Sequence, residues 1–138
     1  MRIYISGKIG GSPITRDVRE KFARAEEMLK AMGHVAINPA GEWYQNTMKT
    51  DFDIFKHIMD YEGILYYDLG WLRTCTAIYM LDDWSKSPGA SAEYSYAVAT
   101  GKKIFFQDAE DAQCFVRSTD FDEWRLVWLP IESQEAEP

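Results

Sequence analysis

Short apolar runs alternate with helix-like segments over most of this chain, and this alternation constrains its fold more than any other feature. Strands that are linked by helices lie parallel in one sheet, and the connections between them are right-handed. The sequence therefore predicts an α/β fold with a mostly parallel, five-stranded sheet. We place its strands at residues 2–6, 34–38, 76–81, 102–107 and 124–129.

The segments between these strands carry apolar residues at helical spacing. We place helices at residues 15–32, 51–73 and 91–100, and a short amphipathic segment at residues 110–117. The second helix is expected to break around Glu62 and Gly63. Residues 40–50 follow neither period clearly, so we expect a loop there. From that loop the ring of Trp43 would either stack on a planar ligand or pack against the protein itself.

Length and charge limit what the chain can be. Its 138 residues predict a single domain, residues 1–138, with an acidic, disordered tail at residues 133–138. The formal net charge of −7 argues against a polynucleotide ligand, because clustered lysines and arginines bind phosphate backbones. Cys75 and Cys114 form no metal-binding pattern and favour a reduced, cytoplasmic protein. We expect no membrane partner, because no signal peptide and no apolar run of membrane-spanning length is present.

The segment between the third strand and the third helix carries the clearest candidate site. Residues 84–93 read Trp-Ser-Lys-Ser-Pro-Gly-Ala-Ser-Ala-Glu, and Pro88 and Gly89 end the strand. In a parallel sheet this loop lies at the carboxyl edge, where the N–H groups of the following helix favour an anion. We expect Glu93 in or near the first turn, where the helix dipole helps to keep a carboxylate ionised. The plain alternative is a solvated helix acid.

A glycine-rich turn follows the first strand and is expected at the same edge of the sheet. It reads Gly7-Lys8-Ile9-Gly10-Gly11-Ser12-Pro13. Its spacing matches neither the dinucleotide-binding fingerprint nor a P-loop. A plain strand-to-helix turn is equally consistent with this composition.

Three stretches of the chain resemble the nucleoside 2-deoxyribosyltransferase family. The likeness is closer to its branch of nucleotide N-glycoside hydrolases, and closest to the deoxyribosyltransferase-like domains frequent in phages and prophages. The opening strand and glycine turn match at Tyr4-Ile5-Ser6-Gly7-Lys8-Ile9-Gly10-Gly11, and a D-x-x-x-L helix matches at Asp68-Leu69-Gly70-Trp71-Leu72. Residues 84–97 match the most specific signature, W-x-x-S-x-G-A-x-x-E-x-x-x-A. The resemblance implies a flavodoxin-like, doubly wound sheet and a homodimer or higher homo-oligomer.

The resemblance also implies a covalent mechanism at Glu93. Members of the family use a glutamate at this position to attack the anomeric carbon of a deoxyribosyl group and release the base. Water or a second base then resolves the glycosyl-enzyme. A fixed carboxylate beneath the anomeric carbon suits an oxocarbenium-like transition state. By resemblance, Tyr4 orients that carboxylate through its hydroxyl.

Three acids are available to protonate the departing base. Asp68 lies in an aromatic-rich helix and is either solvated or aimed inward, where desolvation would raise its pKa toward that of a proton donor. Many relatives carry an aspartate where this chain has Thr76, so the base-side acid that the resemblance implies is missing there, and Asp68, Asp82 and Asp83 are the candidates to replace it. Asp68 is our first choice. Asp82 and Asp83 either bind a base edge or a sugar hydroxyl or weaken the anion site, and we count Asp83 among the expected substrate contacts.

Ser87, six residues before Glu93, indicates a phosphorylated substrate by resemblance. Nucleoside-acting transferases carry an aspartate there that binds the free 5′-hydroxyl, whereas the nucleotide hydrolases carry a serine that binds a 5′-phosphate. A hydroxyl with loop N–H groups accepts a phosphate dianion, which an aspartate would repel. With Lys8 as the point charge, the substrate contacts expected at this edge are Ser6, Gly7, Lys8, Ser87 and Gly89.

The sequence thus predicts hydrolysis of the N-glycosidic bond of a (deoxy)nucleoside 5′-monophosphate, with transfer to another base as a further outcome. Two alternatives stay open. One is a non-catalytic module that binds or sequesters a nucleotide, and the other is an NAD-type glycohydrolase. The prediction needs no cofactor and no metal, and the expected partner is a small-molecule nucleotide.

Overall fold

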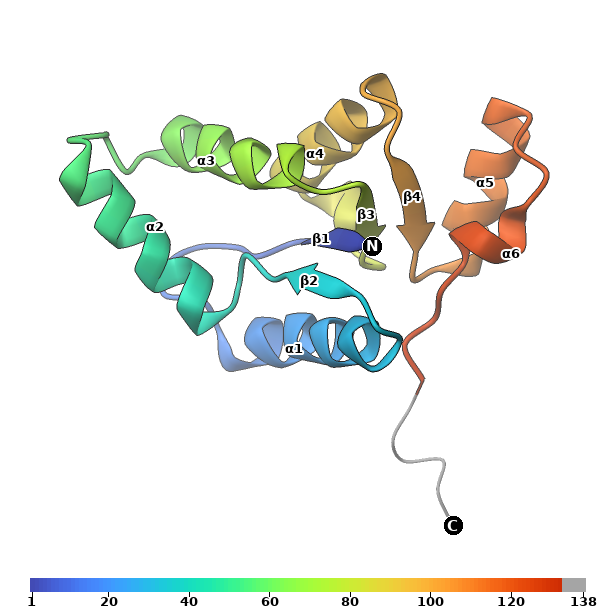
Figure 1. Cartoon of the computed structure of the whole chain (residues 1–138), viewed down its shortest axis with the longest axis horizontal. Helices are drawn as coiled ribbons and strands as arrows, with labels where there is room; N and C mark the ends of the chain where they lie inside the picture. Colours follow the sequence, from blue (N-terminus) through green and yellow to red (C-terminus); the bar gives the residue numbers. More distant parts are fainter. Residues whose placement is uncertain (133–138) are drawn as a thin grey trace, which may run out of the picture.

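Four parallel strands form the centre of the molecule in the computed structural model, which describes residues 1–132 (Figure 1). They are β1 (Arg2–Ser6), β2 (Val35–Ile37), β3 (Ala77–Met80) and β4 (Lys103–Phe106). Their order, β2-β1-β3-β4, places the reversal of strand order between β1 and β3. This order is consistent with a flavodoxin-like sheet, in which ligands bind at the carboxyl ends of the strands beside that reversal. The predicted tail at residues 133–138 lies outside the described residues.

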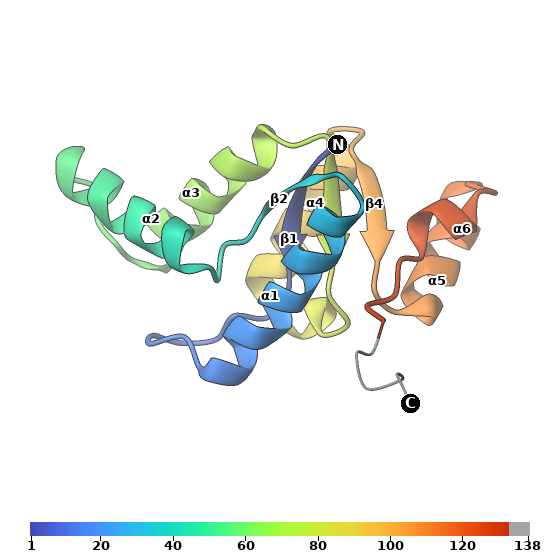
Figure 2. The ribbon, with the colours of Figure 1, turned by 60° about the horizontal axis from the view of Figure 1, so that its bottom comes forward.

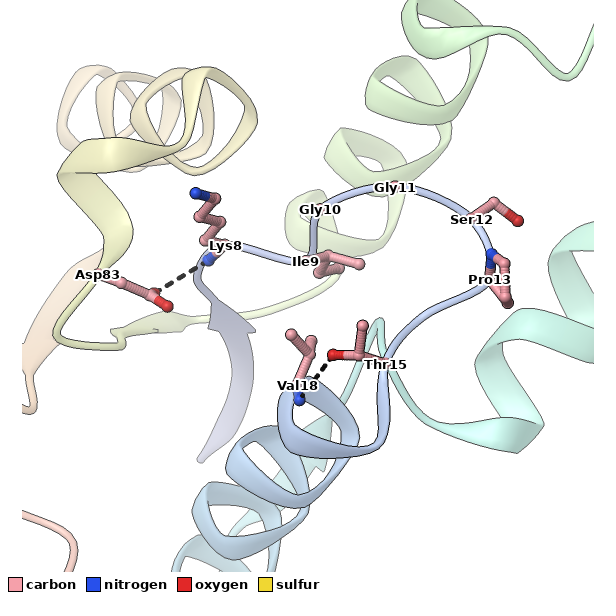
Figure 3. A pocket seen from close by; sticks show the side chains of 9 residues that line it. All are labelled: Lys8, Ile9, Gly10, Gly11, Ser12, Pro13, Thr15, Val18 and Asp83. Atoms are coloured by element: carbon pink, nitrogen blue, oxygen red, sulfur yellow. Dashed lines mark hydrogen bonds between the residues drawn. The ribbon is translucent and has the colours of Figure 1, made fainter.

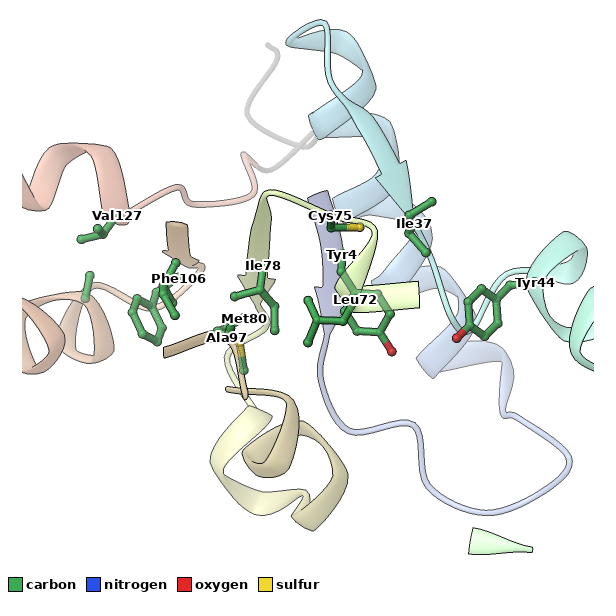
Figure 4. Packing of buried hydrophobic residues seen from close by; sticks show 12 residues of the cluster. Tyr4, Ile37, Tyr44, Leu72, Cys75, Ile78, Met80, Ala97, Phe106 and Val127 are labelled. Atoms are coloured by element: carbon green, nitrogen blue, oxygen red, sulfur yellow. The ribbon is translucent and has the colours of Figure 1, made fainter. Parts of the chain in front are cut away.

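Strand β1 contributes to the core on both faces of the sheet. Ile3, Tyr4 and Ile5 are fully buried, and successive side chains of a strand point to opposite faces. Ile3 and Ile5 belong to one apolar cluster, which includes Phe22, whereas Tyr4 belongs to the cluster on the other face with Leu72 (Figure 4). Both faces of the sheet are therefore covered, as an almost continuously apolar strand requires.

Helices cover these two faces, with α1 on one side and α3 and α4 on the other (Figures 1 and 2). The main helices are α1 (Arg16–Ala31), α2 (Glu42–Ile54), α3 (Tyr61–Arg73), α4 (Pro88–Ala99) and α5 (Ala109–Thr119). Thr15 begins α1, because its hydroxyl accepts a hydrogen bond from the N–H of Val18 at 3.3 Å. None of the helices within residues 1–132 has both the length and the hydropathy that crossing a membrane requires.

Residues 40–50 form most of a helix instead of the predicted loop. Tyr44, Met48 and Phe52 recur every four residues and are buried along one side of α2, which is the spacing of a single helix face. Three buried positions in 13 residues leave only a weak helical period in the sequence. Helices α2 and α3 together form an arm, residues 42–73, that extends beyond the sheet (Figure 2).

The break in the arm lies at residues 55–60, and not around Glu62 and Gly63 as predicted. Gly63 instead lies in the first turn of α3, where the N-cap Asp60 accepts a hydrogen bond from its N–H at 2.8 Å. A Cβ atom at Gly63 would lie 2.4 Å from the carbonyl oxygen of Ile58. Glycine is therefore required here because the connection at residues 55–60 passes close to the first turn of α3. Gly63 does not break the helix.

The predicted fifth strand at residues 124–129 is wrong, and the part of the chain that the structure describes holds four strands. The segment forms the one-turn helix α6 (Trp124–Val127) and then meets the edge of β4 through a single bridge between Phe106 and Trp128. The rings of Trp124 and Trp128 stack with centroids 5.3 Å apart. Residues four apart come this close on a helix turn but not along a strand, so the aromatic pair favours the helix.

Candidate active site

Glu93 lies buried between α4 and the end of β1, with 5% of its surface exposed. Its Oε2 accepts a hydrogen bond from the Tyr4 hydroxyl at 2.6 Å, and its Oε1 accepts one from the Ser6 hydroxyl at 2.7 Å. Tyr4 and Ser6 are two residues apart on β1, so their side chains lie on the same face of the sheet. The strand therefore fixes both oxygens of this carboxyl group, and Ser6 contacts Glu93 where the sequence predicted a phosphate contact.

The surroundings of Glu93 differ from those expected. It is the sixth residue of α4, in the second turn, and its burial rules out a solvated helix acid. Burial, followed by the charge of nearby Asp68, raises the pKa of Glu93 to about 8, although the hydrogen bonds from Tyr4 and Ser6 lower it. Loss of hydration is the largest of these influences, and it acts against the ionisation that the helix dipole was expected to favour.

Asp68 faces inward from α3 toward the same cluster. Burial raises its pKa to about 6, and the hydrogen bond that its Oδ1 accepts from the Tyr44 hydroxyl, at 2.6 Å, lowers the pKa. Figure 4 shows the hydroxyl groups of Tyr4 and Tyr44 turned toward each other. One side of the sheet therefore gathers five polar side chains, which we call the carboxyl cluster: Tyr4, Ser6, Tyr44, Asp68 and Glu93.

The other two predicted acids, Asp82 and Asp83, are engaged elsewhere. Both form ion pairs with Lys21 of α1, and that of Asp83 spans 3.2 Å. Asp83 Oδ1 also accepts a hydrogen bond from the backbone N–H of Lys8 at 3.0 Å (Figure 3). These contacts tie the glycine-rich turn to the end of β3. Asp83 is therefore a structural link in this turn, and Asp68 is the acid that lies beside Glu93.

The glycine-rich turn surrounds a hollow of 420 Å³ that is separate from the carboxyl cluster. At its start, a Cβ atom on Gly7 would lie 2.8 Å from Cδ1 of Leu81, so only glycine lets the turn pass the end of β3. The side chain of Lys8 extends from the turn toward α4 in Figure 3. The hollow is lined by Lys8, Ile9, Gly10, Gly11, Ser12, Pro13, Thr15, Val18 and Asp83.

The beginning of α4 is flanked by two hydroxyl groups. Ser87 caps the helix, and its hydroxyl accepts a hydrogen bond from the N–H of Ala90 at 3.2 Å. A Cβ atom on Gly89 would lie 3.3 Å from the hydroxyl oxygen of Tyr61, the first residue of α3. Tyr61 therefore reaches from the arm to the end of α4 at which free N–H groups favour an anion.

Two further residues that the sequence singled out lie apart from the carboxyl cluster. Trp43 is 63% exposed on α2, and its ring meets that of Trp71 edge-on with centroids 5.6 Å apart. Thr76 lies just before β3, at the amino ends of the strands, where its N–H donates to the carbonyl of Arg2. The contacts of Glu93 with β1 extend to Ser6 at the carboxyl end of that strand. The lack of an aspartate at Thr76 therefore takes nothing away from the cluster.

Comparison with known proteins assigns the chain to a family. A family model described as Domain of unknown function (DUF4406) matches residues 1–106. The chain belongs to the DUF4406 family. The DUF4406 match extends from β1 to β4 and includes the whole carboxyl cluster, whereas α5 and α6 lie outside it. No curated protein and no solved structure matches the chain.

Within the DUF4406 region, the structure adds two tyrosines that the sequence did not place at the site. Tyr44 reaches Asp68 from α2, and Tyr61 reaches Gly89 from the start of α3. The first contact depends on how α2 packs against α3, and the second on how α3 packs against α4, and local patterning encodes neither. For Tyr44 a signal existed, because its four-residue spacing with Met48 marks the buried face of α2.

Proposed function

We propose that this protein hydrolyses the N-glycosidic bond of a (deoxy)nucleoside 5′-monophosphate through a covalent glycosyl intermediate on Glu93. One observation carries the proposal: Glu93 is buried, both of its carboxyl oxygens are held by hydroxyl groups, and Asp68 is close enough to perturb its pKa. Most glycoside hydrolases use two carboxyl groups whose different surroundings set their different roles. The resemblance to the deoxyribosyltransferase family supports the same chemistry and a flavodoxin-like fold.

In the first step, a carboxylate oxygen of Glu93 attacks the anomeric carbon of the sugar. The bond from that carbon to the base nitrogen breaks, and its electron pair leaves with the base. Asp68 donates a proton to the departing base and becomes a carboxylate. The hydrogen bonds from Tyr4 and Ser6 hold the nucleophile in place while the new ester bond forms.

In the second step, a water molecule attacks the same carbon and gives a proton to the Asp68 carboxylate. The ester bond breaks, and its electron pair returns to Glu93. The products are the free base and the (deoxy)ribose 5-phosphate, and both carboxyl groups regain their starting state. A second base in place of water would make the same intermediate a transfer reaction.

Hydrogen bonding favours this division of roles between the two carboxyl groups. Both oxygens of Glu93 accept hydrogen bonds, which stabilises its ionised form, whereas Asp68 accepts one and keeps an oxygen for a proton. Burial opposes the ionisation of Glu93 and raises its pKa to about 8. Positive charge that develops on the sugar in the transition state acts in the opposite direction and favours the ionised nucleophile.

The beginning of α4 supports a 5′-phosphate on the substrate. The N–H groups of this helix end, the Ser87 hydroxyl and the Tyr61 hydroxyl near Gly89 all lie one to two turns before Glu93. Lys8 extends toward the same helix and would supply a positive charge (Figure 3). This combination of hydroxyl, N–H and lysine groups suits a phosphate dianion. We also expect, from the family resemblance, a homodimer or higher homo-oligomer.

The test is to incubate the protein with each deoxynucleoside and ribonucleoside 5′-monophosphate and to follow base release by chromatography. Glu93→Gln should abolish release, whereas Glu20→Gln should retain it, because Glu20 pairs with Arg16 on the exposed side of α1. Circular dichroism would check that each variant is folded. Failure of the folded wild-type protein to release a base from any of these nucleotides would contradict the proposal.

A non-catalytic nucleotide-binding module is the second candidate, and the burial of Glu93 favours it. A carboxyl group with a pKa of about 8 is mostly protonated at neutral pH and then does not act as a nucleophile. Calorimetry separates the two functions: a binder holds intact nucleotide equally well in the wild type and in Glu93→Gln, with no turnover. Nicotinamide release from NAD in the same chromatographic assay would instead identify an NAD-type glycohydrolase.

A further inference from the structure

Tyr44 is held rigidly beside the carboxyl cluster. It is 2% exposed, and its hydroxyl donates to Asp68 Oδ1 at 2.6 Å. Its ring contacts those of Tyr67 and Trp71, and both centroid distances are 5.8 Å. An aromatic ring packed against two others keeps its hydroxyl at one place, so the hydrogen bond fixes one oxygen of Asp68.

The second oxygen of Asp68 remains available. No other hydrogen bond within residues 1–132 reaches this carboxyl group, and every buried polar side-chain atom of that part of the chain has a partner. Oδ2 therefore reaches solvent, because a buried oxygen without a hydrogen bond would break this pattern. A carboxyl group with one oxygen fixed and the other accessible is arranged to exchange a proton with a ligand.

Resting on the proposed function, we propose that Tyr44 is a positioning residue, which fixes Asp68 Oδ1 so that Oδ2 exchanges a proton with the departing base. Tyr44 stays a neutral donor in both steps, because burial and the charge of Asp68 raise its pKa far above the ordinary value. Its hydrogen bond stabilises the charged form of Asp68 and so limits the rise of the Asp68 pKa that burial causes. A group that first gives and then takes a proton works best with a pKa near the working pH.

The titratable groups around Asp68 come from four elements. Tyr44 approaches from α2, Glu93 from α4 and Tyr4 from β1, while Tyr67 lies on the same helix as Asp68. Among these described residues Glu93 is the one other carboxyl group. Its protonation is therefore coupled to that of Asp68, and the two titrate as a pair in two macroscopic steps. A titration that tests Tyr44 has to follow both carboxyl groups.

The direct test compares two tyrosine variants of the full chain. Tyr44→Phe removes the hydroxyl and keeps the ring, and Tyr67→Phe is the matched control, since Tyr67 donates to Asp51 at 2.8 Å. Carboxyl ¹³C NMR titration without substrate should place the pKa of Asp68 above about 6 in Tyr44→Phe and at the wild-type value in Tyr67→Phe. An unchanged Asp68 titration in Tyr44→Phe, or the same shift in both variants, would overturn the proposal.

Kinetics then separate this role from the function on which it rests. Tyr44→Phe should lower kcat by roughly ten- to a hundredfold with little change in KM. It should also shift the high-pH limb of the pH–rate profile to higher pH, because the pKa of Asp68 rises. If the wild type is active and Tyr44→Phe has the same pH–rate profile, the role of Tyr44 alone is overturned. A wild type that releases no base would overturn the proposed function, and the role of Tyr44 with it.

A second variant covers the case in which Tyr44→Phe does not fold. Asp68→Asn leaves the phenol in place, and it should shift the ¹³Cζ resonance of Tyr44 because the charged acceptor is lost. Asp51→Asn is the matched control, because it changes the partner of Tyr67 and should leave the Tyr44 resonance unchanged. If the ¹³Cζ chemical shift of Tyr44 is the same in Asp68→Asn as in the wild type, the proposal is overturned.

Discussion

Two tyrosine–aspartate hydrogen bonds join α2 to α3, and they differ in their surroundings. Tyr44 of α2 donates to Asp68 of α3 at 2.6 Å, and Tyr67 of α3 donates to Asp51 of α2 at 2.8 Å. The first bond belongs to the buried carboxyl cluster, whereas the second lines a groove along the arm. In each bond a tyrosine hydroxyl donates to an aspartate of the other helix. Burial raises the pKa of Asp68, and the neighbouring Glu93 carboxyl group gives the first bond its place in the proposed chemistry.

The largest expected difference between the two bonds lies in catalysis. Asp68→Asn should lower base release by about 10²- to 10⁴-fold, because the departing base loses its proton donor. Asp51→Asn should leave the rate within about threefold, since a group remote from the reacting atoms contributes little to the transition state. Steady-state rates on one nucleoside monophosphate measure both. Equal losses in the two variants would mean that the arm acts as a structural unit and that Asp68 is not the acid.

The pH dependence of stability should come next in size. The folded-state pKa values of Asp68 and Glu93, about 6 and about 8, lie above those of an unfolded chain. Their contribution to the free energy of unfolding is therefore complete at low pH and is lost as the pH rises through these values. Glu93→Gln should flatten this fall between pH 6 and pH 8, where one group contributes at most about 1.4 kcal/mol per pH unit.

Urea unfolding at a series of pH values measures this effect. Glu20→Gln serves as the control, because its side chain is exposed and paired with Arg16. Curves for wild type and Glu93→Gln that stay parallel between pH 6 and pH 8 would contradict the raised pKa of Glu93.

The two bonds should also differ in their contribution to stability at fixed pH. Tyr44→Phe should cost about 2 kcal/mol of unfolding free energy, because a buried hydrogen bond to a carboxyl group is lost. Tyr67→Phe should cost about 0.5 kcal/mol, since solvent replaces its hydroxyl at Asp51. Urea unfolding at pH 7 compares them. A larger cost for Tyr67→Phe would reverse the comparison.

The smallest expected effect concerns the other end of the arm. Tyr61→Phe should weaken the preference for a nucleoside monophosphate over the free nucleoside by about threefold, because an exposed hydroxyl near the phosphate is worth little more than one weak hydrogen bond. The ratio of kcat/KM for the two substrates is the measurement. Tyr66→Phe is a suitable control, because Tyr66 is also exposed on α3 but lines the groove on the arm. An equal effect in both variants would remove Tyr61 from the phosphate site.

Local sequence signals predicted the parts of the molecule that depend on local physics. Strand β1 was predicted with its observed bounds, Arg2–Ser6, because β-branched and aromatic residues cluster there. Its spacing also explains why Tyr4 and Ser6 meet the same carboxyl group. Thr15 and Gly33 marked the ends of α1, since a cap and a residue with positive φ act within a few residues of themselves.

Contacts between distant elements were not predictable in the same way. The burial of Glu93 comes from β1 and α3 packing against α4, and a helix viewed alone exposes a first- or second-turn acid. Residues 124–129 have the composition of a strand, but the stacking of Trp124 on Trp128 favours a helix turn. Propensity therefore gave the wrong element there, because a packing contact between two residues four apart outweighed it.

The single bridge between Phe106 and Trp128 also has a consequence for association between molecules. An open edge of a sheet presents unpaired N–H and C=O groups on which a strand of another chain can add. Here the N–H of Leu129 and Nε1 of Trp128 donate to the carbonyls of Phe106 and Gln107, at 2.8 and 3.2 Å. The opposite edge is β2, which is three residues long. The bridge occupies the Phe106 end of β4, and β2 offers three residues, so a strand of another chain would find few consecutive groups with which to pair.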